Sequence, residues 1–500
     1  RSYKGSVIGS EKGNIQVYAG GNYLQESSAL LANAGKVSIN AKQVESIAHD
    51  NVTLSGNRTS DTKVGGFAKV SSPLIDLFNT VTGARDILRD DKAGDRMKAM
   101  KGAVLALQGY QAISDLSTGT IARVEVGTGI KHAHADYHEQ DIRGQGNIIN
   151  GAKGIEITAR EGYIDLSQID LATTTYNAQS QKNEVTSGSY VYLDGKRGIN
   201  LRSGRDEFHA KGRQTGYSMV SGVGAQVGAQ TGAYAYAEVG YNNATQQTDS
   251  HTKINSHIMT ERLIAKTDGD MNLIGASAYA DRIETDVKGK LNIVSEQSTA
   301  QYNAKGTNVG LRVQVSFGTA WSVGGSYGSN KTRSNYHGVQ EQAGLFAGDG
   351  GYRINVQNHT NLEGGLITSS QLAETTGKNS FSTGTLSYSD IENHGNYSGS
   401  GLAISASVSM EGKSLQGMQK TAGYGKEEGG QHNITKSGIN TANLHITDIE
   451  KQQRLLNYHN VPTGEINDGF AIDTPNSKLI ARENPIALKD YLSNIKTDIT

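Results

Sequence analysis

A short unit recurs along the chain, in which a glycine precedes apolar residues that alternate with polar ones. It stands at residues 13–17, 35–39, 154–157, 198–201, 289–293 and 351–356. Alternation at period two places the Ile, Val and Leu side chains on one face of a short strand, and the glycine supplies the turn before it. Strands this short become stable when they stack as rungs. The pattern predicts a mainly β fold, a right-handed parallel β-helix. An antiparallel sandwich would also alternate, but with more hairpin signals and more apolar residues.

Three longer stretches, residues 216–241, 306–328 and 398–412, carry small or apolar residues at every second place. Runs of Ser, Thr, Asn and Lys follow or flank them. We expect Gly-rich β-hairpins that project from the β-helix. Strands that face lipid alternate in the same way. Because Gly and Ala dominate where lipid favours Leu, Val and Phe, we favour hairpins outside the membrane, with membrane insertion as the alternative.

Residues 65–120 follow a helical period instead. Pro73 comes after two serines, as at a helix start, and apolar residues then recur at spacings of three and four. Members of this series are Leu74, Leu77, Phe78, Val81, Leu88, Met97, Met100, Val104 and Leu107. We expect an amphipathic helical-hairpin insert that packs on itself or on the β-helix. A membrane-active or partner-binding hairpin is the alternative.

The character of the chain changes again after residue 440. A charged stretch of helical composition at residues 448–457 precedes three of the four prolines. We therefore expect four segments. They are β-helix rungs at 1–64, the helical insert at 65–120, a β region with Gly-rich hairpins at 121–450, and a linker or the start of a further module at 451–500.

Composition supports an elongated β protein. Gly makes up 62 of 500 residues, well above the usual share of about 7%, and Pro only 4. Hydrophobic residues are 35% of the chain, too few for a compact globule of this length. Cysteine is absent, as suits a chain that crosses an oxidising periplasm unfolded. The sequence has no signal peptide and no apolar run long enough to span a bilayer, so we expect any export signal or anchor to lie outside it.

The best metal candidate is a histidine-rich run. If the run is extended, His132, His134, Asp136 and His138 project on one face, and imidazole and carboxylate suit zinc or nickel. Such neighbours are about 6.5–7 Å apart along a strand, which is wide for one ion. We therefore favour a solvated polar face and keep the histidines as weak metal candidates.

Other motifs carry less chemistry. Residues 325–332 resemble a phosphate-binding loop, but Asn330 stands where a glycine must precede Lys331. Asp268 and Asp270 are the nearest approach to an acidic cluster, and a solvated turn explains them. We expect no catalytic site and no cofactor. The net charge of −1 gives no indication of nucleic-acid binding.

The rungs and hairpins together resemble the haemagglutinin repeats of filamentous-haemagglutinin-type exoproteins, which Gram-negative bacteria export by two-partner secretion. The residues that carry the resemblance are 316–328, 351–356, 361–369, 388–393 and 437–448. Residues 72–81 are similar to the helical insert of contact-dependent growth inhibition effectors. The resemblance spans roughly residues 1–450, and the ordered set is more specific than any single motif.

The resemblance implies a non-enzymatic stalk, exported through a dedicated outer-membrane partner barrel and displayed on the bacterial surface. In the inhibition effectors this region helps to carry a C-terminal toxin across the outer membrane of the target cell. The implied partners are the secretion barrel, the target outer membrane or a receptor on it, and host surface molecules. An adhesin or haemagglutinin stalk that binds host cells is the main alternative. A β-helical carbohydrate-active enzyme would require acidic and basic residues clustered on neighbouring rungs.

Overall fold

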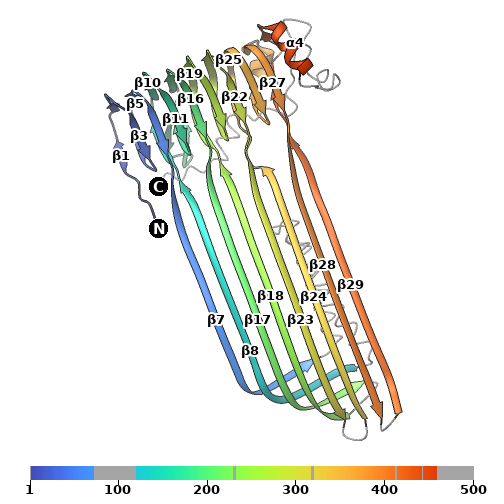
Figure 1. Cartoon of the computed structure of the whole chain (residues 1–500). Coiled ribbons are helices and arrows are strands. Elements are labelled where there is room, and N and C mark those ends of the chain that lie inside the picture. The colour runs from blue at the N-terminus through green and yellow to red at the C-terminus, as the bar shows by residue number, and fades with distance from the viewer. Residues whose placement is uncertain are drawn as a thin grey trace.

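Two large sheets account for most of the chain. The computed structural model describes residues 2–71, 120–228, 232–316, 320–411, 414–441 and 443–458. Short parallel strands coil at one end, and eight long antiparallel strands run side by side away from them (Figure 1). The prediction of a mainly β chain is confirmed, and the large parallel sheet is consistent with a β-helix.

Each turn of the coil adds one strand to each of three parallel stacks. The first stack contains β1 (Val7–Ser10), β4 (Ala29–Ala32), β9 (Asn147–Gly151), β12 (Ile169–Ala172), the starts of β19 (Ser256–Thr267), β21 (Ala276–Val287) and β25 (Gly344–Glu363), then β26 (Leu366–Thr368) and β30 (Gly438–Ile439).

The second stack contains β2 (Ile15–Tyr18), β5 (Lys36–Ala41), β10 (Gly154–Ala159), β15 (Tyr190–Gly195), later parts of β19, β21 and β25, the start of β27 (Ser380–Ser389), and β31 (Leu444–Ile446). The third contains β3 (Tyr23–Glu26), β6 (Val44–Ile47), β11 (Tyr163–Ser167), β16 (Gly198–Arg202), β20 (Asp270–Ile274), β22 (Leu291–Val294) and the ends of β25 and β27. All six glycine-led units of the sequence lie in these stacks.

The inward side chains of the stacks form one aliphatic core. Ile157 lies directly between Ile39 and Leu193 on the neighbouring turns, and all three are at most 1% exposed. Burial of each such side chain contributes about 1.5–3 kcal/mol. Because every rung repeats this arrangement, the core is long and thin, as the low hydrophobic content requires.

The chain turns a corner each time it passes from the third stack to the first. These corners are of two kinds, which alternate from one turn of the coil to the next. After β3, β11, β20 and β25 the chain passes directly to the next turn. Each of these corners holds one residue with a left-handed backbone: Ser27 (φ 43°), Gln168 (φ 44°), Gly275 (φ 60°) and Gly364 (φ 56°). After β6, β16, β22 and β27 a long hairpin leaves the coil instead. A hairpin therefore leaves at every second turn and always from the same corner.

The four hairpins pair side by side into the antiparallel sheet. Its strands, in spatial order, are β7 (His49–Ser71), β8 (Thr120–Gln145), β17 (Gly204–Gly228), β18 (Gly232–Ile254), β23 (Gln297–Ser316), β24 (Ala320–Val339), β28 (Ile391–Glu411) and β29 (Ser414–Thr435). Neighbouring strands lie about 4.8 Å apart in any sheet. One hairpin adds two strands and two turns of the coil add two rungs, so both sheets advance by the same distance.

The remaining elements are small. β13 (Thr174–Asn177) and β14 (Lys182–Val185) form a short hairpin, and α3 (Gln371–Thr375) is a single turn. The helical composition at residues 448–457 is confirmed by α4 (Ile449–Tyr458). Gln452 of α4 is 1% exposed and bonds the backbone of Leu386 (2.6 and 2.8 Å). Gln452 thus holds α4 against β27 of the coil. The linker or further module expected at residues 451–500 stays a prediction.

Most of the expected helical insert, residues 72–119, lies outside the described residues. Its expected beginning is wrong, because residues 65–71 are the end of β7. This stretch is antiparallel to β8, and Phe67 pairs with Gly127. The two glycines before Phe67 interrupt the alternation of apolar and polar residues, so the sequence did not indicate a strand there.

The left-handed corner at Gly275 provides a test of the coil. We expect Gly275→Ala to lower the free energy of unfolding by roughly 1–3 kcal/mol, because a left-handed Ala costs about 1–2 kcal/mol. Its Cβ would also lie 2.7 Å from Cβ of Ser203. Gly325→Ala is the matched control, since the nearest atom to its Cβ is 3.8 Å away. Urea unfolding followed by circular dichroism measures both, and equal midpoints would contradict the strained corner.

Candidate functional site

The antiparallel sheet has two different faces. Direct cross-strand partners share a face, and successive residues of a strand alternate between faces. We name the faces after two adjacent residues of β23, the Leu311 face and the Arg312 face. In the half of the sheet far from the coil, each large hydrophobic side chain that is strongly exposed points to the Leu311 face. These side chains are Val64, Val124, Val126, Ile130, Tyr217, Met219, Val223, Val239, Tyr241, Val309, Leu311, Val313, Val315, Trp321, Tyr327, Ile404, Met418 and Tyr424. We call this set the apolar face.

The apolar face extends across all eight strands, and Met418 and Tyr424 represent it on β29. One register row joins Val64, Ile130, Met219, Val239, Leu311, Gly325 and Ala406 as successive partners and ends at the charged Lys420. Soluble monomers seldom expose an apolar patch larger than a few hundred Å². A surface of this extent marks a contact with lipid or with another protein.

A row of tyrosines marks the edge of the apolar face nearest the coil. Tyr217 pairs with Tyr241, Tyr241 with Val309, and Val309 with Tyr327. We call this register position the tyrosine row. On the coil side of the row, the same face carries mostly Thr, Asn, Gln, His, Lys, Arg, Asp and Glu, with Leu54 as an exposed apolar exception. An amphipathic tyrosine ring suits the boundary between an apolar and a wet environment.

The Arg312 face is polar over the same strands. Glu125 is 2% exposed and accepts a hydrogen bond from the Tyr234 hydroxyl (2.6 Å) and an ion pair from Arg312. The Arg312 guanidinium lies 4.5 Å from the centre of the Tyr236 ring. Glycine makes room for this network, since a Cβ at Gly224 would lie 2.5 Å from the Tyr234 ring. A charged network, with tyrosine rings packed over glycine, thus lies on the side of the sheet opposite the apolar face.

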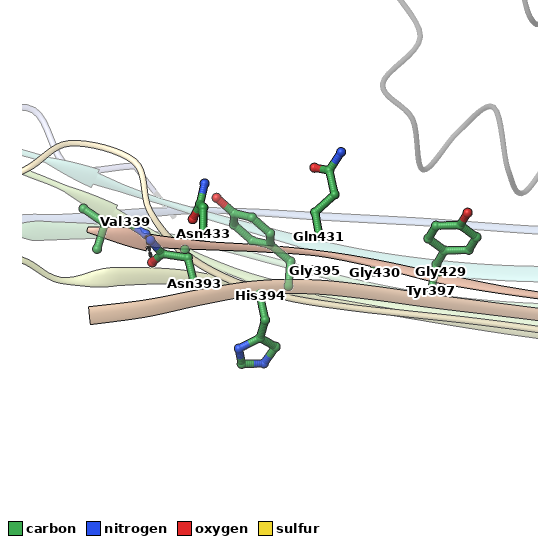
Figure 2. Close-up of a pocket in the computed structure, with 11 residues that line it drawn as sticks. Val339, Asn393, His394, Gly395, Tyr397, Gly429, Gly430, Gln431 and Asn433 are labelled. Atoms are coloured by element: carbon green, nitrogen blue, oxygen red, sulfur yellow. Dashed lines mark hydrogen bonds between the residues drawn. The ribbon is translucent and has the colours of Figure 1, made fainter. Parts of the chain in front are cut away.

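Closer to the coil, the last two hairpins form a shallow groove on the Arg312 face. Its volume is about 480 Å³, and Tyr336, Asn393, Tyr397, Gln431 and Asn433 line it. Figure 2 shows Tyr397, Gln431 and Asn433 on one side of the sheet and His394 on the other. Tyrosine rings and amides are suited to stacking on and hydrogen bonding with a polar, ring-shaped ligand.

The predicted metal candidates lie on β8 and point to the Leu311 face. His132 Nδ1 is 2.8 Å from Thr62 Oγ1, and its ring stacks on Tyr217 at 5.0 Å. His138 Nε2 is 3.1 Å from Asp136 Oδ1. A hydrogen bond from Arg58 holds the pKa of Asp136 below its ordinary value. In the described part of the chain, no three His, Asp or Glu side chains gather as a metal site would require, and metal binding by His134 and its neighbours stays a weak prediction.

Three further histidines form a ladder on the Leu311 face. His337, His394 and His432 are successive cross-strand partners, with ring centres 4.7 and 6.2 Å apart. Sequence reasoning did not find them because they lie on three strands of two hairpins. The register that joins them is set by tertiary structure.

His257 connects the coil to the base of a hairpin. It donates from Nδ1 to Asp170 on the preceding turn and from Nε2 to Glu341 just after β24, both at 2.8 Å. Burial alone lowers the pKa of His257, but the two carboxylates outweigh it and raise the pKa to about 9. The imidazolium thus links two turns to a hairpin base.

The comparisons with known proteins agree with this architecture. The haemagglutinin repeat family matches residues 126–311. Residues 126–311 are a haemagglutinin-repeat region. The matched residues run from Val126 on β8 to Leu311 on β23 and include β9 to β22. No solved structure matches this chain.

Relatives extend the match beyond the repeat family. The chain is 28% identical to the deoxyribonuclease CdiA of Dickeya dadantii over 81% of its length, and 27% identical to the tRNA nuclease CdiA of Escherichia coli strain NC101 over 91%. It is 25% identical over 93% of its length to the deoxyribonuclease CdiA of Yersinia pseudotuberculosis. The chain spans only 12%, 14% and 43% of these three relatives. No helix among the described residues is both long and apolar enough to cross a membrane.

The protonated His257 predicts a pH dependence of stability. Its ordinary pKa of 6.5 is raised to about 9 on folding, so the stabilisation is complete below about pH 6.5 and is lost as the pH rises towards 9. We expect the free energy of unfolding to fall by roughly 2 kcal/mol over this range, and His257→Gln to flatten the profile. Urea unfolding at a series of pH values measures this. The exposed His445→Gln is the control, and an unchanged slope in His257→Gln would contradict the role.

Proposed function

We propose that this chain is a non-enzymatic part of an exported bacterial surface protein, and that it uses its apolar face to contact the outer membrane of a target cell. In this role it helps to deliver a toxin that follows it in the full-length effector. The observation that carries the proposal is the gathering of the exposed hydrophobic side chains on one face of the sheet, with a polar network behind them.

The names of the relatives support a shared delivery role. They include a deoxyribonuclease, a tRNA nuclease and a 16S rRNA endonuclease, and the chain matches each of them over at least 81% of its own length. A region common to proteins with different nuclease activities is better explained by delivery than by any one of the reactions. We propose accordingly that nuclease activity lies outside this chain.

The dimensions of the apolar face suit a bilayer. On β17 the face runs from Tyr217 to Ala225, which is about 27 Å along the strand at roughly 3.4 Å per residue and about 21 Å of depth for a strand tilted by about 40°. The apolar band of bacterial outer-membrane proteins is about 25 Å tall and is bordered by aromatic residues. The tyrosine row occupies the corresponding border.

The remaining expectations fit this proposal. We propose export through an outer-membrane partner barrel, as the resemblance implies, and a right-handed coil, since parallel strands of one sheet are connected right-handedly in about 98% of cases. We retain the segment order of rungs, helical insert at residues 72–119, and hairpin-bearing repeat region. The sheet and the insert would act at the target surface while the coil serves as the stalk.

The only tryptophan of the chain allows a direct test. Trp321 lies on the apolar face and is 39% exposed. With neutral phosphatidylcholine vesicles, we expect the chain to float with the lipid and the Trp321 emission to shift to shorter wavelength. Brominated acyl chains should quench this emission.

A charged side chain on the apolar face should prevent this contact. We expect Leu311→Asp to weaken vesicle binding at least roughly tenfold, because lipid disfavours a charge. Asn308→Asp adds the same charge three residues away on the Arg312 face and should bind as the parent chain does. Equal binding by both variants, or a Trp321 emission that does not change when lipid is added, would contradict the proposed membrane contact.

An adhesin role is the second candidate, favoured by the groove on the Arg312 face. Tyr336 and Tyr397 with three amides could hold a sugar of a host glycan. A glycan array with the parent chain and Tyr397→Ala tests this role. Binding lost in Tyr397→Ala and kept in Tyr176→Ala, an exposed tyrosine of the small hairpin, would support it. An array without any bound glycan would count against it.

A further inference from the structure

Five cations gather on the Leu311 face, between the coil and the tyrosine row. We call them the basic patch: Lys211 and Arg213 on β17, Lys305 on β23, and Lys331 and Arg333 on β24. They occupy two neighbouring register rows. Arg213, Thr245, Lys305 and Lys331 are successive partners in one row, and Lys211, Gln247, Asn303 and Arg333 in the other. The patch therefore spans four strands, or about 14 Å across the sheet.

The carboxylates near the basic patch are bound by other side chains. Asp249, which is close enough to Lys211 to interact with it electrostatically, is hydrogen-bonded by His209 (2.9 Å). All five side chains are exposed, and within the described ranges no carboxylate lies within 4.0 Å of them. Asp136, which pairs with Arg213 across the strands, is bound by Arg58 (3.1 Å). Glu428, which ends the second row, is bound by Lys426 (2.7 Å). The chain as a whole has a net charge of −1, so the positive charge is local.

One pair within the patch opposes folding. Lys305 and Lys331 are direct cross-strand partners, and like charges in this position destabilise a sheet. Lys305 has a second cross-strand partner, Thr245. A carboxylate side chain at that position would relieve the repulsion, but the chain has a threonine there. An anionic ligand that binds both ammonium groups would relieve this repulsion.

The position of the patch suits the phosphate level of a membrane. Lys305 is four residues from Val309 of the tyrosine row, which is about 14 Å along the strand. With strands tilted by about 40°, this becomes a depth of roughly 10 Å. The headgroup layer is about 5–7 Å thick on each side of the hydrocarbon, and flexible Lys and Arg stems reach several ångströms more. With the tyrosine row at the hydrocarbon boundary, the cations lie beside the headgroups.

We propose that the basic patch binds the phosphate groups of anionic lipids while the apolar face contacts the bilayer; this inference rests on the proposed membrane contact. Lys offers compact charges to phosphate, and Arg offers paired donors. The adjacent apolar face favours a membrane as the occupant, because a soluble polyanion would leave those side chains in water. The patch would add electrostatic attraction to the apolar contact and set its depth.

Vesicle binding by the whole 500-residue chain tests the proposal. The probes are phosphatidylcholine vesicles and vesicles of phosphatidylethanolamine with about a quarter phosphatidylglycerol. We expect tighter binding to the anionic vesicles, weakening as salt is raised. The variant Lys305→Gln/Lys331→Gln should lose roughly thirtyfold in affinity for the anionic vesicles alone, since each of the two basic residues near such a surface contributes about 1 kcal/mol.

The chain offers a matched control. Lys63 and Lys131 are also direct cross-strand partners, but they lie on the Arg312 face. Lys63→Gln/Lys131→Gln removes the same charge and should leave the preference for anionic vesicles unchanged. Circular dichroism confirms that both variants keep their strand content.

The outcomes separate this inference from the proposed function. Binding with a shifted Trp321 emission on both kinds of vesicle, and no preference between them, would retain the membrane contact and overturn the phosphate role. Equal losses in the two double variants would also overturn it. Binding to neither kind of vesicle would overturn both proposals. Displacement from the anionic vesicles by duplex DNA at matched phosphate concentration would assign the patch to polyanions in general and overturn the lipid role.

Discussion

The spacing between neighbouring strands links the coil to the sheet that projects from it. Each turn of the coil rises by one rung, about 4.8 Å, and each hairpin is two strands wide. A hairpin on every turn would need twice the available width, and a hairpin on every third turn would leave unpaired strand edges. Departure at every second turn, as after β6, β16, β22 and β27, satisfies both sheets. The left-handed residues at the intervening corners, such as Ser27 and Gly275, let the chain continue where no hairpin leaves.

Two surfaces follow from this arrangement. Within the described residues, the strands that stand away from the coil pack mainly against one another, so the two faces of their sheet differ through alternation along each strand. On the Arg312 face, glycines such as Gly224 let tyrosine rings lie flat over the backbone and hold a buried ion pair. On the Leu311 face the same strands present Val, Leu and Met to the surroundings. In the sequence, the many Gly and Ala residues of these stretches argued against lipid contact. Some of these residues lie on the Arg312 face and therefore do not dilute the apolar face.

The sequence predicted the rungs because a rung is a local pattern. The unit at residues 351–356 contains its own period and its own turn, and it lies in the second stack of β25. The hairpins were predicted only in their apolar halves, since stretches such as Gln246 to Ile254 of β18 carry no period. The hairpin of β7 and β8 was not predicted, because 48 residues separate its two strands in the sequence. The apolar face and the basic patch depend on register between hairpins, which no single stretch of sequence contains.

Register itself must be fixed near the coil. The half of the sheet nearest the coil is polar on both faces, and polar strands resist slippage poorly because no buried side specifies their alignment. Buried hydrogen bonds at the corner can supply that alignment. Asn393 accepts from the backbone of Val339 (3.0 Å), and Asn147 donates to Ile47 (3.0 Å). A slip of one residue would turn Leu311 and its neighbours to the opposite face. The polar bonds at the hairpin bases thus determine which surface the distant ends of the strands present.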